Sequence, residues 1–132
     1  MGAWSNGPFD NDDAADFMME LEAAPSWDMV RLAFDDVRAN SEYVELAEGA
    51  RAYAGAALIT VATGKSDISA QDYYMTLDAM GSPPDDLIPM ARTILKRLTT
   101  GDSELRELYL DSGNYNEWIG IVASVDQALK TE

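Results

Sequence analysis

The chain has 132 residues, of which 47% are hydrophobic, and this size is typical of a single domain built around one core. It contains no cysteine and no histidine, which excludes disulfide bridges, thiolate or imidazole catalysis and the usual zinc ligands. Its 24 acidic and 9 basic residues give a net charge of −15, and a negative field of this size repels nucleic acid backbones. We therefore expect one domain, residues 1–132, that binds no nucleic acid.

The first ten residues form a lead-in rich in Gly, Ser, Asn and Pro that also carries two large aromatic side chains, Trp4 and Phe9. Aromatic rings of this kind bury a large apolar area when they pack. We predict that residues 1–10 cover one end of the core. An exposed recognition loop is the alternative interpretation.

Two amphipathic helices are predicted in the acidic first third of the chain. The first begins after Asn11, a good N-cap, carries acids in its first turn and ends before Pro25. The second is capped by Ser26 and ends near Asn40. Their apolar stripes consist of Ala14, Phe17, Met18 and Leu21, and of Val30, Ala33, Phe34 and Val37.

The third predicted helix, residues 42–63, is rich in Ala and is apolar nearly all round in its second half. Such a helix is normally buried at the centre of a domain. Gly55 would allow a neighbouring helix to approach closely, and Gly64 supplies a left-handed stop.

Shorter helices are predicted in the second half of the chain, where no segment shows the alternation of a strand. They comprise residues 69–80 with Ser69 as cap, residues 89–100 with Pro89 in the first turn, a short helix capped by Asp102 or Ser103, and a last helix opened by Asn114. The predicted fold is all-α: an irregular compact bundle of about six or seven short helices around the central Ala-rich helix.

Membrane insertion and secretion are not expected from this sequence. The longest nearly apolar run, residues 52–62, falls well short of the roughly 20 residues needed to span a bilayer. No basic stretch followed by an apolar one marks a secretory signal, so a cytoplasmic location is expected.

The opening of the chain resembles a known family. Residues 1–17 read MGAWSNGPFDNDDAADF, and residues 102–109 read DSELRELY, followed by Trp118. Both segments resemble a family of small bacterial proteins described as domain of unknown function 4259, in which Gly is more usual at the position of Ser5. The resemblance implies a helical fold and a bacterial cytoplasmic setting, and it implies no activity or catalytic residue.

The densest carboxylates in the sequence are Asp10, Asp12, Asp13, Asp16 and Glu20. A calcium loop starting at Asp10 would need Gly at position 15 and Glu at position 21, where Ala15 and Leu21 stand. We therefore predict no metal ligand, no cofactor and no catalytic residue. The acids can simply complement the helix dipole and solvate one helix face, or they can face a partner.

The uneven distribution of charge along the chain favours the hypothesis that the acids face a binding partner. Residues 1–50 hold 12 acidic and 2 basic residues, so this part carries most of the net charge. The acidic face is predicted to bind a basic protein, in the manner of small immunity or antitoxin proteins that cover a cationic site with complementary charge. The basic residues Arg92, Lys96 and Arg97 are interpreted as dipole complements near a helix end.

Two other functions are compatible with the sequence. Paired carboxylates could hold a divalent cation in an enzyme. An apolar patch formed by Met18, Met19 or Tyr74 could instead make a homo-oligomeric structural module. The identity of a partner and the oligomeric state are left open by the sequence.

Overall fold

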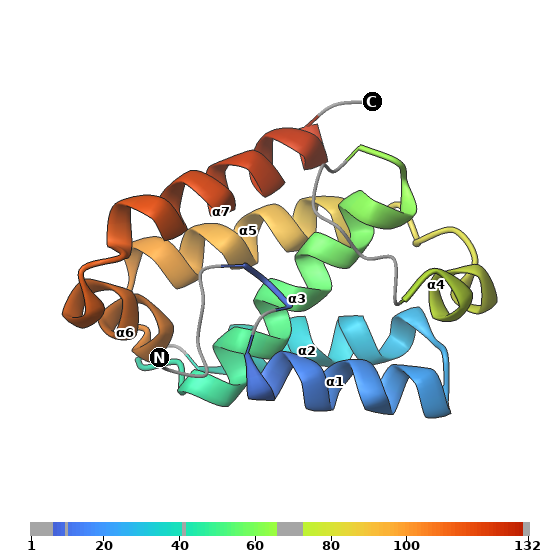
Figure 1. Ribbon diagram of the computed structural model, residues 1–132, viewed down its shortest axis with the longest axis horizontal. Coiled ribbons are helices and arrows are strands. Elements are labelled where there is room, and N and C mark those ends of the chain that lie inside the picture. The colour runs from blue at the N-terminus through green and yellow to red at the C-terminus, as the bar shows by residue number, and fades with distance from the viewer. Residues whose placement is uncertain (1–6, 10, 41, 66–72, 131–132) are drawn as a thin grey trace.

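The computed structural model describes residues 7–9, 11–40, 42–65 and 73–130. In these ranges the chain folds into seven α-helices and forms no strand (Figure 1). The helices are α1 (Asp12–Ala23), α2 (Trp27–Ala39), α3 (Leu46–Ala62), α4 (Tyr74–Met80), α5 (Leu87–Thr100), α6 (Glu104–Ser112) and α7 (Tyr115–Lys130). The predicted all-α class is confirmed.

Helix α3 is the centre of the bundle. It contacts α1, α2, α5, α6 and α7, and residues 52–60 are buried without interruption. In Figure 1 it crosses the molecule between a layer formed by α1 and α2 and a layer formed by α5 and α7. The small side chains of this helix let both layers come close, as the sequence predicted. At Gly55 an added Cβ would lie 3.1 Å from Val30 Cγ1 and 3.4 Å from Phe34 Cε1, so α2 packs directly on the backbone.

Side-chain caps begin helices α1, α2 and α6. Asn11, which is 3% exposed, accepts a 2.8 Å hydrogen bond from the Ala14 amide at the start of α1. Ser26 accepts from the Asp28 amide at α2, and Ser103 accepts from the Arg106 amide at α6. Each cap satisfies an amide that has no partner inside its helix. Of the two predicted caps for α6, the structure uses Ser103.

Helix α3 begins at Leu46, four residues later than predicted. Val44 forms an isolated parallel bridge with Ser103: its amide donates to the Asp102 carbonyl at 3.1 Å, and its carbonyl accepts from the Glu104 amide at 2.9 Å. The Leu46 amide then donates to Glu104 Oε1 at 3.0 Å. This long-range pairing holds the segment before α3 extended, and its local sequence gives no sign of it.

The boundaries of α4 and α5 also differ from the prediction. The proposed cap Ser69 lies outside the described residues, and α4 is a short helix that starts at Tyr74. Helix α5 starts at Leu87, so that Pro89 falls in its first turn, where a missing amide proton costs nothing.

An aromatic cluster joins α3, α6 and α7. Trp118 is fully buried and stacks on Tyr109 with the ring centroids 4.9 Å apart and an interplanar angle of 14°. Tyr53 meets the indole edge-on at 6.4 Å, and Tyr115 lies tilted against it at 5.9 Å. Trp118 Nε1 has no hydrogen-bond partner among the described residues. The cluster is held by apolar burial and ring packing.

None of the helices in the described ranges is both long enough and apolar enough to cross a lipid bilayer.

The contact between Tyr43 and Glu107 predicts a pH effect. The Tyr43 hydroxyl donates to Glu107 Oε1 at 3.0 Å. Partial burial, followed by this hydrogen bond and the nearby negative charge, raises the pKa of Tyr43 from 10.0 to about 12. The contact therefore stabilises the fold fully below pH 10, and this contribution is lost as the pH rises through about 12.

Glu107→Gln is expected to move the pKa of Tyr43 down toward its ordinary value, because the substitution removes the adjacent negative charge. Phenolate absorbance during an alkaline titration measures this, with Tyr43→Phe as the control that identifies the Tyr43 signal. An unchanged titration in Glu107→Gln would contradict the assignment.

Candidate functional site: the acidic face of helix α1

Helix α1 buries one side against the core and turns its acids away from it. Its buried residues are Ala14, Phe17, Met18 and Leu21. On the other side Asp12, Asp16 and Glu20 are exposed at i, i+4 and i+8, and Asp13 is half-buried beside them. This spacing gives one continuous row along the helix. We call Asp12, Asp13, Asp16 and Glu20 the α1 acidic stripe.

The carboxylates of the stripe form no ion pair in the described part of the chain. No Lys or Arg side chain in the described ranges lies within ion-pair distance of these four carboxylates. The arginine pairs that do form are Arg31 with Asp86, Arg38 with Asp35, Arg51 with Asp36, and Arg92 with Asp126. Within these ranges no basic side chain neutralises the stripe through an ion pair.

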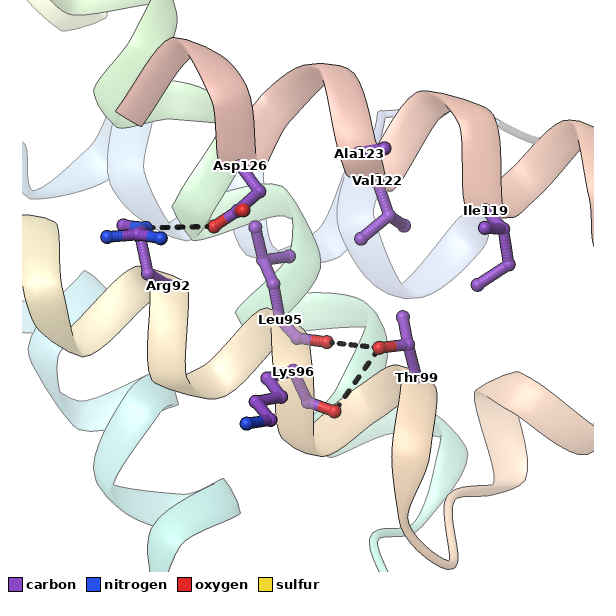
Figure 2. Close-up of a pocket in the computed structure, with 8 residues that line it drawn as sticks. All are labelled: Arg92, Leu95, Lys96, Thr99, Ile119, Val122, Ala123 and Asp126. Carbon is purple, nitrogen blue, oxygen red and sulfur yellow. Dashed lines mark hydrogen bonds and ion pairs between the residues drawn. The ribbon is translucent and has the colours of Figure 1, made fainter. Parts of the chain in front are cut away.

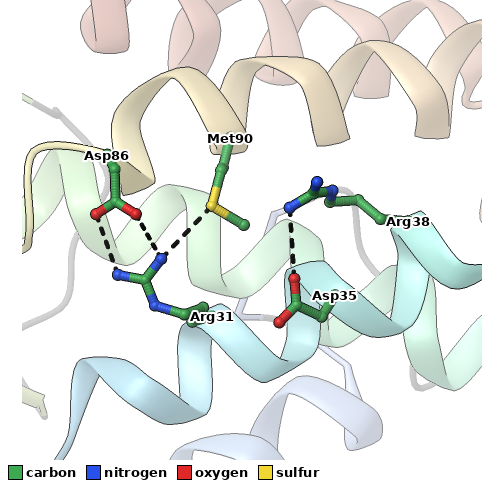
Figure 3. Close-up of polar contacts among 5 residues, drawn as sticks. All are labelled: Arg31, Asp35, Arg38, Asp86 and Met90. Carbon is green, nitrogen blue, oxygen red and sulfur yellow. Dashed lines mark hydrogen bonds and ion pairs between the residues drawn. The ribbon is translucent and has the colours of Figure 1, made fainter.

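Helix α2 differs, because its flank toward α5 has its charges paired. Figure 3 shows Arg31 reaching Asp86 at the start of α5, with the Arg31 Nη2 to Asp86 Oδ1 distance at 3.0 Å. Arg31 Nη1 completes a bidentate contact with the same carboxylate and also lies 3.8 Å from Met90 Sδ. The hydrogen bond from Arg31 lowers the pKa of Asp86. Arg31 is partly exposed and Asp86 is exposed, so the pair orients α2 on α5 and contributes little stability.

Two of the three basic residues on α5, Arg92 and Arg97, point toward different partners. Arg92 Nε donates to Asp126 Oδ1 of α7 at 3.0 Å, whereas Arg97 Nη2 turns toward the Asn40 carbonyl, 3.4 Å away. Only Arg97 lies in the last turn of α5, so the dipole interpretation applies to one of the three residues.

A groove of about 290 Å³ runs between α5 and α7 (Figure 2). Its lining residues are Arg92, Leu95, Lys96, Thr99, Ile119, Val122, Ala123 and Asp126. The Thr99 hydroxyl donates to the carbonyls of Leu95 and Lys96, and Arg92 is paired with Asp126. The side chains of Arg92, Thr99 and Asp126 therefore have hydrogen-bond partners along the walls of the groove.

Other predicted residues have mixed outcomes. Phe9 is half-buried, packs against the core and meets the Tyr73 ring edge-on at 5.7 Å. Trp4 and Asp10 lie outside the described residues.

Met18 is buried, so it is not part of an apolar patch, while Met19 and Tyr74 are exposed. Within the described ranges no group of three or more Asp or Glu side chains is placed to hold a metal ion.

Leu32 is an exposed apolar residue that the sequence did not point to. Leu32 of α2 is 61% exposed, and it lies on the flank of α2 that faces α1 together with Met29 and Asp36. Its i, i+3 and i+7 spacing with these two residues was visible in the sequence. The sequence instead pointed to the apolar positions that include Val30 and Phe34, and these are the residues of α2 that pack on the core.

Comparison with known proteins identifies a family for this chain. The family model described as a domain of unknown function (DUF4259) matches residues 2–120. Neither the curated proteins nor the solved structures contain a significant match to this chain. Since the family model covers most of the chain, the protein belongs to the family described as domain of unknown function (DUF4259).

Proposed function

We propose that this protein is a non-catalytic binding domain whose α1 acidic stripe docks on a basic partner protein. One observation carries the proposal: the stripe is a row of four carboxylates without an ion-pair partner among the described residues, on a chain of net charge −15. Elsewhere in the described ranges Asp35, Asp36, Asp86 and Asp126 each lie within ion-pair distance of an arginine.

Complementary charge would act first on the rate of encounter. A negative surface attracts a cationic partner over several ångströms and raises the association rate constant, an effect that salt screens. An inhibitor of the immunity or antitoxin type works in this way when it covers the cationic site of a toxin. The family resemblance favours the bacterial cytoplasm as the place where it acts.

Identification of the partner comes first. The tagged protein is used to capture binding proteins from the native cell, and mass spectrometry identifies them. The proposal expects a protein with a basic surface that salt releases. It is contradicted when the captured protein has an acidic surface, or when salt does not release it.

The matched measurement compares two variants with the same change in net charge. Asp12→Asn with Asp16→Asn and Glu20→Gln neutralises three of the four stripe carboxylates. Asp78→Asn with Asp85→Asn and Asp111→Asn neutralises three exposed acids elsewhere. Affinity for the identified partner is expected to fall about tenfold or more in the first triple variant, mostly through slower association, and only slightly in the second. Equal losses in both would show that only total charge matters and would contradict a stripe-specific site.

A further inference from the structure

A second groove lies beside the α1 acidic stripe, between α1 and α2. Its volume is about 190 Å³, and its lining residues are Phe17, Glu20, Met29, Leu32, Ala33, Asp36 and Arg51. Both helices pack on α3, which contributes Arg51. Phe17 and Ala33 are buried in the floor, and Leu32 stands 61% exposed at the edge. We call this feature the α1–α2 groove.

Two carboxylates and the Arg51 guanidinium border the groove, so its rims carry a net negative charge. Glu20 belongs to the stripe and has no ion-pair partner in the described part of the chain. Asp36, on the opposite helix, lies 3.9 Å from Arg51, which is a long contact between two partly exposed side chains. An apolar floor is therefore bordered by one carboxylate from each helix.

We infer that the α1–α2 groove receives an apolar side chain from a basic amphipathic segment of the partner, whose Lys or Arg residues lie against Glu20 and Asp36. This inference rests on the proposed function and names the kind of partner surface that the stripe would meet. An apolar anchor surrounded by charge is a common arrangement at protein interfaces, where the anchor supplies affinity and the charges supply orientation.

Size and charge select this occupant over others. The groove is smaller than the roughly 300 Å³ at which pockets for small molecules begin, so it suits one or two anchoring side chains. A second copy of the chain would bring another net charge of −15 to an acidic rim. A basic helix with one apolar edge satisfies both the floor and the rims.

Two synthetic peptides test the inference on the intact protein. The first is an amphipathic helical peptide of Lys and Leu, and the second has the same length and charge with Ser in place of Leu. At moderate salt the wild-type protein is expected to bind the Lys/Leu peptide about tenfold more tightly, because only this peptide can fill the groove. Leu32→Ser should reduce this preference to about threefold or less. Leu110→Ser, which changes another exposed leucine on α6, should leave it unchanged.

Amide chemical shifts of the wild-type protein locate the bound peptide independently of any variant. The largest shifts are expected for Met29, Leu32 and Ala33. Shifts that concentrate instead on Val122 and Ala123 would place the peptide in the α5–α7 groove and overturn the inference. Equal affinity for the two peptides, or a preference that Leu32→Ser leaves intact, would also overturn it.

The two proposals fail in different ways. If wild-type protein binds both peptides equally and the stripe variant weakens both, the acidic binding face stands and the apolar anchor is wrong. If the stripe variant leaves both affinities unchanged at low salt, the proposed function itself is contradicted.

Discussion

Trp118→Ala is expected to lower the free energy of unfolding by about 4 kcal/mol, within the range measured for large aromatic residues removed from protein cores. Trp118 is fully buried, and it contacts Tyr53 of α3, Tyr109 of α6 and Tyr115 of α7. Its removal would leave a cavity at the point where three helices meet. In a chain of this size the loss corresponds to a fall in Tm of roughly 15 °C.

Urea unfolding followed by circular dichroism measures this effect, and Trp118→Phe is the matched control. Phenylalanine keeps a ring in the stack and removes the Nε1 proton, which has no partner among the described residues. The cost of Trp118→Phe should therefore be less than half that of Trp118→Ala. A loss below about 1 kcal/mol for the alanine variant would show that the cluster is not central to the core.

Much of the fold was predictable because its signals are local. Asn11, Ser26 and Ser103 cap helices where the sequence placed caps, and the apolar stripe of α1 is the one that is buried. The start of α3 was not predictable in this way, because Val44 pairs with Ser103, almost sixty residues away in the chain. Helical periodicity does not record such pairings.

The candidate site likewise has one part that local sequence predicts and one part that depends on contacts between helices. The helical spacing of Asp13, Asp16 and Glu20, at i, i+3 and i+7, was enough to predict that they share one face. The α1–α2 groove depends on where α3 holds two helices relative to each other, and Arg51 enters it from that third helix. A single amphipathic pattern gives no information about a surface shared by three elements. For this reason Leu32 stood out only in the structure, as a large apolar side chain that is 61% exposed.

Gly55→Leu is expected to destabilise the fold by about 2–3 kcal/mol, although leucine is a better helix former than glycine. The Cβ of any residue at this position would lie 3.1 Å from Val30 Cγ1 and 3.4 Å from Phe34 Cε1, and leucine adds three further carbons. Either α2 must move away from α3 or the side chains must leave their preferred rotamers. Both changes disturb the contact between the central helix and α2.

Gly120→Leu is the matched control, since it makes the same change in the middle of another helix. Gly120 is exposed on α7, and an added Cβ there meets no atom within 4 Å. Only the gain in helix propensity remains, so this variant should be about 0.5–1 kcal/mol more stable than the wild type. Thermal and urea unfolding of the two variants should therefore give shifts of opposite sign. A Gly55→Leu protein as stable as Gly120→Leu would mean that α2 does not rest on the backbone of α3.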